Sequence, residues 1–425
     1  MEEPRGIMIL RGFFMEKTKR LIGVLGIIMF LSGNAAAQNP FGLSNAIYEK
    51  LIQTTIVNEG NTYRLKKVIE KIKKGEDVYI AAIGGSVTEG AGPAKFTDGY
   101  AFQFFRAVKE KYAPGEGKNV FFDGAGLSGT PSLLGAVRYE KDVVKVLNHT
   151  PDLLIVEFAV NDGGEPVFQR SFEALIRNAL YQNEETAVIA LYCAATYGNT
   201  SGPKKEVGDY YNIPQINMLP VVNECLEKGT FKKEEFYADY VHPTIDGHKF
   251  MTDCLLSILA KAEKSKDEKP VLPEKPFIEP TLDNMIFING DDENVKITEG
   301  GFNQIDKNTQ TIKKTNSAEF SKNWHHQFNA KPNVEPFKME IKCKSLVLVW
   351  KNQSAGAFEK FGKAQVLVDG LNVGIFDGGK AGGWNNCETN LIIDGKTTKK
   401  HIVEIKMLTK DEKLGFTILA MSYTK

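Results

Sequence analysis

The chain has 425 residues, which is more than one ordinary domain needs and predicts about two or three domains. Its hydrophobic content of 42% is enough to build buried cores. Lysine and arginine together number 53, as do aspartate and glutamate, so the formal net charge is zero. This balance gives no reason to expect a nucleic acid or an anionic membrane surface as a partner.

The first segment of the chain has the pattern of an export signal. Met15 is followed by basic residues, then by an apolar run over 21–31, and then by alanines at 35–37. The apolar run is too short to span a bilayer, and small residues after it are typical of a signal-peptide cleavage site. We therefore expect residues 1–37 to be a signal peptide with an upstream extension before Met15. The mature protein, from about Gln38, is expected to be secreted or periplasmic without a membrane anchor.

Residues 38–263 alternate between apolar strands and amphipathic helices. Near-continuous apolar runs predict buried strands, and the segments between them have apolar residues at helical spacing. The runs lie at 77–85, 119–126, 151–160 and 186–195. Apolar strands separated by helices are typical of a parallel sheet that is covered on both faces. The sequence thus predicts a doubly wound α/β domain.

The composition changes after this domain. Residues 264–280 are charged and rich in proline, which predicts a semi-rigid exposed linker. Residues 281–425 contain short β-like runs separated by turn signals such as Asp394-Gly395, and they show no helical period. This pattern predicts an all-β sandwich or jelly roll.

The cysteine pattern carries no chemistry of its own. The chain has five cysteines, and none of them forms a C-x-x-C pair. Neither a zinc site nor a disulfide framework is therefore indicated. Buried free thiols are the expected state, and one or two disulfide bridges in an exported protein are the alternative.

The first predicted strand ends in a glycine-rich turn around one serine, in the stretch IAAIGGSVTEGAG over 80–92. Gly85 and Gly90 have the spacing of a phosphate-binding loop, but the lysine that such a loop requires is missing. Thr88 stands where the nucleophile elbow of α/β-hydrolases requires its last glycine. What remains is Ser86 at the carboxyl end of a strand, where open α/β sheets bind their ligands. A plain strand-to-helix turn capped by serine is the alternative interpretation.

A nucleophilic serine needs a base, and the stretch DYVHP supplies the best candidate. His242 follows Asp239 by three residues, just before the last predicted helix of the α/β domain. This spacing can place the carboxylate beside the imidazole, which then accepts the serine proton. His248 falls on that helix, where a surface or packing role is the plainer interpretation.

The ends of the second and third predicted strands offer candidate oxyanion donors. GLSGT over 126–130 presents the backbone N–H groups of Gly126 and Gly129, and VND presents the side-chain amide of Asn161. Each stretch is also a good turn by itself. Three strand ends that converge on one crevice are nevertheless what an active site predicts.

In chain order, the stretches GGSVTEG, GLSGT, VND and DYVHP resemble the four sequence blocks of the SGNH or GDSL hydrolases, over about residues 77–261. The resemblance implies a flavodoxin-like fold and a metal-free ester hydrolase that needs no cofactor. Matched by position, it implies Ser86 as nucleophile, Asp239 and His242 as the acid–base pair, and the Ser86 N–H, Gly129 and Asn161 as oxyanion donors. Two positions depart from the family pattern, namely Gly85 in place of aspartate and Ala159 in place of glycine.

Two further residues are candidates for substrate binding. Trp384 lies among glycines and asparagines, where an aromatic face can stack on a sugar ring, although a core position is the alternative. Glu89 is either the acid of a helix N-terminus or a contact to substrate.

An SGNH domain followed by a jelly roll resembles bacterial carbohydrate acetylesterases that act on plant polysaccharides such as mannan or xylan. In those enzymes the β domain binds glycan or covers the catalytic crevice. We therefore expect an exported esterase that removes O-acetyl groups from oligo- or polysaccharides through an acyl-enzyme. The alternatives are an SGNH lipase or thioesterase that acts on acyl chains, and a glycan-binding protein without turnover.

Overall fold

The computed structural model describes residues 39–288, 295–307, 320–326, 335–352, 361–379, 387–408 and 414–425. The predicted signal peptide and Trp384 lie outside the described residues. Residues 39–425 form one compact unit. Within the described ranges, no helix combines the length and the apolar character that a membrane span requires.

The first half of the described chain is built around a six-stranded sheet in the order β1-β6-β5-β4-β2-β3. Five neighbouring strands are parallel: β2 (Val78–Gly84), β3 (Val120–Gly126), β4 (Leu153–Glu157), β5 (Ala187–Tyr192) and β6 (Gln215–Asn217). The edge strand β1 (Ile56–Asn58) pairs antiparallel with β6. Counted along the chain, the parallel strands follow the order 2-1-3-4-5 of flavodoxin-like folds. The predicted doubly wound α/β fold is confirmed.

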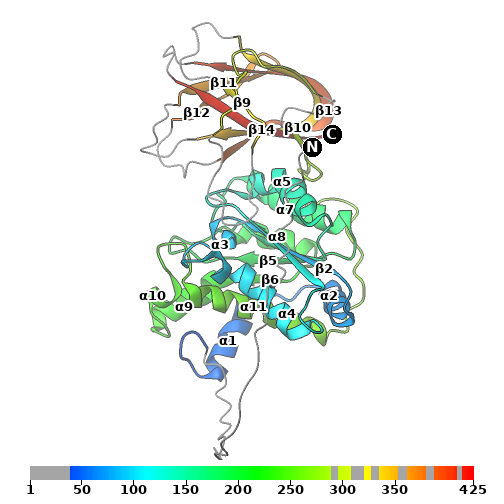
Figure 1. Ribbon diagram of the computed structural model, residues 1–425, viewed down its shortest axis with the longest axis vertical. Helices are drawn as coiled ribbons and strands as arrows, with labels where there is room; N and C mark the ends of the chain where they lie inside the picture. The colour runs from blue at the N-terminus through cyan, green and yellow to red at the C-terminus, as the bar shows by residue number, and fades with distance from the viewer. Residues whose placement is uncertain are drawn as a thin grey trace, which may run out of the picture. The chain divides into compact units, whose positions relative to one another are not determined.

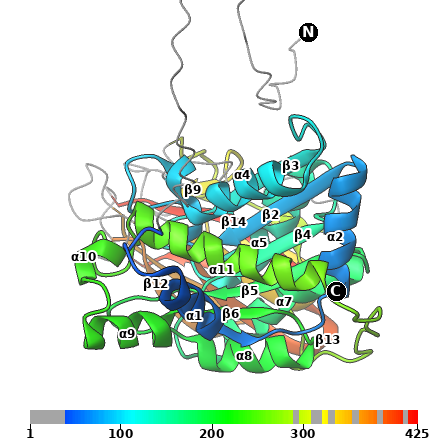
Figure 2. The same cartoon turned by 90° about the horizontal axis from the view of Figure 1, so that it is seen from below.

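Helices cover both faces of this sheet (Figure 1). One face packs against α1 (Asn45–Thr55), α2 (Tyr63–Lys74), α4 (Tyr100–Tyr112), α9 (Met218–Lys228) and α11 (Ile245–Glu263). Figure 2 looks onto this face, with α11 and α1 in front of the strands. The other face packs against α5 (Ser132–Tyr139), α7 (Pro166–Gln182) and α8 (Ser201–Tyr210). Because both faces are covered, every residue of β4 and β5 is buried, which explains their unbroken apolar runs.

The shorter helical segments connect these elements. They are α3 (Ser86–Glu89), η1 (Phe96–Asp98), the π-helical η2 (Glu140–Val144), α6 (Lys145–Leu147) and α10 (Lys233–Phe236). The helix α3 follows directly on β2 and lies against β3. It therefore occupies the carboxyl edge of the parallel sheet, at the point where the strand order reverses.

The second half of the described chain is an antiparallel sheet, as the β-like runs predict. Its main path is β12-β11-β13-β10-β14-β7, while β8 pairs with β10 and β9 with β14. The strands are β7 (Ile286–Ile288), β8 (Lys296–Thr298), β9 (Trp324–His326), β10 (Phe337–Lys351), β11 (Lys363–Val368), β12 (Leu371–Asp377), β13 (Cys387–Met407) and β14 (Phe416–Thr424). Two register shifts interrupt the pairing of β10 with β13, and such irregularities let long strands bend.

The two halves share a buried core. Apolar residues of α5 and α7 form one cluster with residues of β10 and β14, among them Val347, Val349, Leu419 and Ala420. Beside this cluster, the guanidinium group of Arg170 on α7 donates two hydrogen bonds of 2.8 Å to the carboxylate of Asp394 on β13. A bidentate pair of this kind fixes the relative orientation of the two side chains as well as the distance between them.

Residues 264–280, the predicted linker, are exposed or half-buried, and hydrogen bonds tie them to the α/β domain. Near its start, the carboxylate of Asp267 accepts the backbone N–H of Thr62 at 2.8 Å. Near its end, the carboxylate of Glu173 accepts the N–H groups of Phe277 and Ile278. The segment therefore follows the domain surface and does not act as a free spacer.

All five cysteines lie among the described residues and are buried free thiols. Burial raises the pKa of the Cys254 and Cys387 thiols to about 12 in each case. They therefore act as small apolar side chains, as predicted.

Candidate active site

The turn from β2 into α3 places Ser86 at the first position of a four-residue helix. This helix ends at Gly90, whose φ of 94° lies in the left-handed region that favours glycine. A Cβ atom on Gly84 would lie 2.1 Å from Thr88 Oγ1 and 2.5 Å from the carbonyl oxygen of Glu157. Only glycine therefore allows the helix to turn back so tightly onto the strand.

Ser86, His242 and Asp239 form a continuous hydrogen-bonded chain. His242 Nε2 lies 2.9 Å from Ser86 Oγ, and His242 Nδ1 lies 2.6 Å from Asp239 Oδ2. The other carboxylate oxygen, Asp239 Oδ1, accepts the backbone N–H groups of His242 at 2.8 Å and Val241 at 2.7 Å. The structure thus joins residues that lie far apart in the sequence into a serine–histidine–aspartate chain, an arrangement that can activate a serine hydroxyl.

The environment of Asp239 favours its ionised form. Burial by itself would raise the pKa of this carboxyl, but the hydrogen bonds from the side chain and backbone of His242, the bond from Val241 and the attraction to the imidazole lower the pKa below its ordinary value. An ionised carboxylate at this position holds one tautomer of the imidazole. It also stabilises the positive charge that the imidazole gains when it accepts a proton.

Asn161 lies directly against the nucleophile turn. A Cβ atom on Gly85 would lie only 1.9 Å from Asn161 Oδ1, so the glycine that replaces the usual aspartate leaves the space that the amide fills. A buried ion pair holds the Asn161 loop, because Lys204 Nζ lies 3.0 Å from Asp162 Oδ2 and their side chains are 2% and 0% exposed. The other oxygen of Asp162 accepts the backbone N–H of Ser132 at 2.7 Å.

The loop that carries Gly129 is attached to α3 through Glu89. The Oε2 atom of Glu89 accepts the backbone N–H of Ser128 at 2.9 Å and also the Ser128 hydroxyl proton. Gly129 follows with a φ of 70°. Gly126 permits the close approach of α3, since a Cβ atom there would lie 2.1 Å from the backbone nitrogen of Glu89.

This placement changes the interpretation of Glu89. The side chain is 1% exposed and bonds to a neighbouring loop, so it does not reach toward solvent as a substrate contact would. The sequence alone did not reveal this contact, because Glu89 and Ser128 lie far apart in the chain and sequence patterns report only on near neighbours. Glu89 is better described as a residue that positions the Gly129 loop.

A buried carboxyl group lies beneath the turn that carries Ser86. Glu157, at the end of β4, is fully buried, and Thr88 Oγ1 donates to its Oε2 at 3.2 Å. Thr88 Oγ1 also lies 2.9 Å from the hydroxyl of Tyr100. Burial raises the pKa of Glu157 to about 7, although hydrogen bonds from Cys193 and Thr88 oppose the rise. The turn therefore rests on an acid that is largely protonated below that pH.

His248 has a packing role in the structure. It is fully buried, its Nδ1 accepts the backbone N–H of Tyr100 at 3.0 Å, and its Nε2 lies 3.1 Å from the carbonyl oxygen of Ala91. Burial lowers the pKa of this imidazole to about 4, so the ring is neutral at ordinary pH. It joins α11, α4 and the loop after α3.

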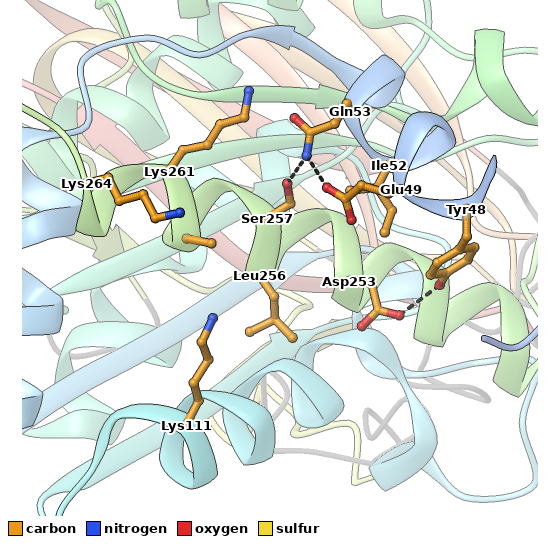
Figure 3. A pocket seen from close by; sticks show the side chains of 11 residues that line it. Tyr48, Glu49, Ile52, Gln53, Lys111, Asp253, Leu256, Ser257, Lys261 and Lys264 are labelled. Carbon is orange, nitrogen blue, oxygen red and sulfur yellow. Dashed lines mark hydrogen bonds between the residues drawn. The ribbon is translucent and has the colours of Figure 1, made fainter. Parts of the chain in front are cut away.

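A pocket of about 500 Å³ lies between α1 and α11, away from these residues. Figure 3 shows hydrogen bonds among several of its polar side chains: the Tyr48 hydroxyl donates to Asp253, and the Gln53 amide donates to Ser257 and Glu49. None of the described residues that line it is a histidine. In the described part of the chain, no cluster of three or more His, Cys, Asp or Glu residues is arranged to hold a metal ion.

The buried acid Glu157 generates a prediction for the Glu157→Gln variant. Between its ordinary pKa of 4.5 and its native pKa of about 7, the folded state binds more protons than the unfolded state. The free energy of unfolding of the wild-type protein should therefore fall as the pH rises through this range, by an amount on the order of a few kcal/mol. Glutamine does not titrate, so the variant should lack this decrease.

The measurement is urea denaturation of both proteins at about pH 5 and about pH 7.5. The quantity compared is the pH-dependent change in the free energy of unfolding, so a constant effect of the substitution cancels. Equal changes in both proteins would show that Glu157 does not titrate in this range.

Comparisons with known proteins agree with this architecture. Residues 82–250 match the GDSL-like lipase/acylhydrolase family. A two-domain esterase active on acetylated mannans is similar in structure, with a TM-score of 0.73 and 23% identity over 88% of this chain and 99% of that one. The structure of such an esterase co-crystallised with mannopentaose gives the same TM-score and identity, over 88% of this chain and 98% of that one. Among curated proteins, none matches the chain.

An acetyl xylan esterase from Geobacillus stearothermophilus is a weaker match, with a TM-score of 0.32 and 18% identity over 44% of this chain and 96% of that one. A score this low supports no argument. At 23% identity, the likeness to the two-domain esterase shows the fold. Residues 82–250, which contain Ser86, Asn161 and His242, match the GDSL-like lipase/acylhydrolase family, and the protein is a carboxylic ester hydrolase.

Proposed function

We propose that this hydrolase removes O-acetyl groups from an acetylated polysaccharide of the mannan or xylan type. The observation that carries the proposal is the hydrogen-bonded chain from Asp239 through His242 to Ser86 at the carboxyl edge of the parallel sheet. We also propose that the protein is exported, on the basis of the signal-peptide pattern over residues 1–37.

In the proposed mechanism, His242 accepts the proton of Ser86 while Ser86 Oγ attacks the acetyl carbon. The resulting tetrahedral oxyanion accepts hydrogen bonds from the backbone N–H groups of Ser86 and Gly129 and from the side-chain amide of Asn161. His242 then donates its proton to the departing sugar oxygen and leaves an acetyl-enzyme. A water molecule that loses its proton to His242 attacks this intermediate, and acetate and free Ser86 result.

Two observations support a glycan substrate. The side chain of Asp239 is 43% exposed and that of His242 is 16% exposed, so the carboxylate and the imidazole reach the surface beside the buried Ser86, where an ester on a bulky polymer can approach. The architecture of an α/β domain followed by an antiparallel β domain also matches that of a two-domain esterase active on acetylated mannans. We propose that the β domain adds glycan binding here, with Trp384 as a stacking residue.

The first test compares esters of different chain length. The wild-type protein should hydrolyse p-nitrophenyl acetate faster than p-nitrophenyl octanoate and should release acetate from acetylated mannan or xylan. The Ser86→Ala variant should lose at least about 1000-fold in kcat, because it lacks the nucleophile. Release of p-nitrophenol and of acetate measures the two activities.

The opposite chain-length preference, without acetate release from any glycan, would favour a lipase or thioesterase. Glycan binding without hydrolysis that depends on Ser86 would instead indicate a binding protein. Comparison of acetylated mannan with acetylated xylan then identifies the polymer.

The second prediction concerns the space beside the nucleophile. In Gly85→Ala, the new methyl group must displace the Asn161 side chain, so kcat should fall by about 100-fold, as for the loss of one oxyanion donor. Stability should change little, because the displaced atom is the end of a side chain. Steady-state kinetics on p-nitrophenyl acetate and thermal unfolding measure the two effects.

Gly202→Ala is the matched control, because a Cβ atom there meets nothing within 4 Å and the substitution should leave kcat unchanged. Asn161→Ala should lose as much activity as Gly85→Ala, and the double variant should lose no more than either one. Additive losses would mean that Gly85 acts through something other than Asn161.

A further inference from the structure

Two exposed tyrosine side chains lie side by side on the surface of the α/β domain. Tyr197 is 61% exposed and Tyr240 is 52% exposed. Their ring centroids are 6.1 Å apart, and the ring planes meet at 46°. Large aromatic side chains that gather at one place on a surface often mark a binding site.

Tyr240 belongs to the loop that carries the proposed base, and Tyr197, in the loop after β5, contacts the loop of the proposed amide donor. Tyr240 directly follows Asp239 in the loop of the base. The hydroxyl of Tyr197 donates to the carbonyl oxygen of Val160 at 3.2 Å, and Val160 directly precedes Asn161. The pair therefore borders the site on the side where the base and the amide donor approach the nucleophile.

Hydrogen bonds also join the two tyrosine loops to each other. The carbonyl oxygen of Tyr240 accepts the backbone N–H and the side-chain hydroxyl of Thr196, both at 2.9 Å. Tyr197 follows Thr196 in the chain, so the backbones that hold the two rings are fixed relative to one another. Rings that are held in this way lose little conformational entropy when they bind a ligand.

We propose that Tyr197 and Tyr240 form a subsite that binds a pyranose ring of the acetylated glycan next to the sugar whose ester is cleaved. A pyranose ring presents C–H groups that pack on an aromatic face, while its hydroxyl groups remain in water. An acyl chain would instead need an enclosed apolar surface, which two exposed and tilted rings do not form. This inference rests on the proposed function and places part of the glycan recognition in the catalytic domain itself.

The test uses the full-length mature protein with chemically acetylated mannopentaose and p-nitrophenyl acetate. Tyr197→Ala and Tyr240→Ala should each lower the ratio of kcat/KM for the oligosaccharide to kcat/KM for the small ester by about tenfold, mainly through KM. Tyr197→Phe and Tyr240→Phe keep the ring and should restore the ratio. Loss of the Tyr197 hydrogen bond is thereby separated from loss of its aromatic face.

Tyr210→Ala is the matched control. Tyr210 is 37% exposed and its hydroxyl also donates to a backbone carbonyl, that of Lys275 at 3.0 Å, but it lies on α8 beside the linker. In the Tyr210→Ala variant, the ratio of kcat/KM for the oligosaccharide to kcat/KM for the small ester should equal that of the wild-type protein. Calorimetric titration of Ser86→Ala with unacetylated mannopentaose, with and without Tyr240→Ala, measures binding in the absence of turnover and should show weaker binding without the ring.

The outcomes distinguish the subsite from the proposed function. Suppose that the wild-type protein releases acetate from the glycan and that both alanine variants keep its kcat/KM ratio. This result would overturn the subsite and leave the proposed function intact. Alanine variants that mainly lose activity on p-nitrophenyl octanoate would also overturn it, since the rings would then bind an acyl chain. A wild-type protein that releases acetate from no glycan would overturn the proposed function first.

Discussion

The close approach of α3 to the ends of the strands is the constraint on which the site depends. Gly84, Gly85 and Gly126 lack the Cβ atoms that would collide with Thr88, Asn161 and the backbone of Glu89. Each missing side chain leaves room for a group that the site uses. The serine can therefore project at the carboxyl edge of the sheet while the amide of Asn161 packs beside it. A methyl group added at any of these glycines would displace either α3 or the group packed beside it.

Buried polar groups then hold the loops around this turn. The Asp162–Lys204 ion pair fixes the Asn161 loop, and Glu89 fixes the loop of Gly129. Buried charges are costly unless they are paired and hydrogen-bonded, so they contribute little to net stability. These groups instead orient the loops, because only a few arrangements of each loop satisfy the hydrogen bonds of its buried polar group. The carboxyl edge of the sheet is thereby organised before any ligand arrives.

The parts of the structure that depend on local pattern were predictable from the sequence. Apolar runs located the strands, and the chain of Ser86, His242 and Asp239 followed from one strand end and one D-x-x-H spacing. The parts that depend on distant partners were not predictable. Lys204 looks like an ordinary helix-surface lysine until the fold brings it to Asp162, and Glu89 looks like a helix-start acid until it meets Ser128. The exposed pair of Tyr197 and Tyr240 likewise exists only after two loops meet.

The shared core between the two sheets has a consequence for how the chain must be made. Leu419 and Ala420, close to the end of the chain, pack in the same cluster as α5 and α7. A nascent chain that has been synthesised only to the end of α11 would thus expose the apolar surface of these helices to water. Exposed apolar surface of this kind favours aggregation until the last strand covers it. The β domain of this protein therefore covers apolar surface of the α/β domain, besides any glycan that it binds.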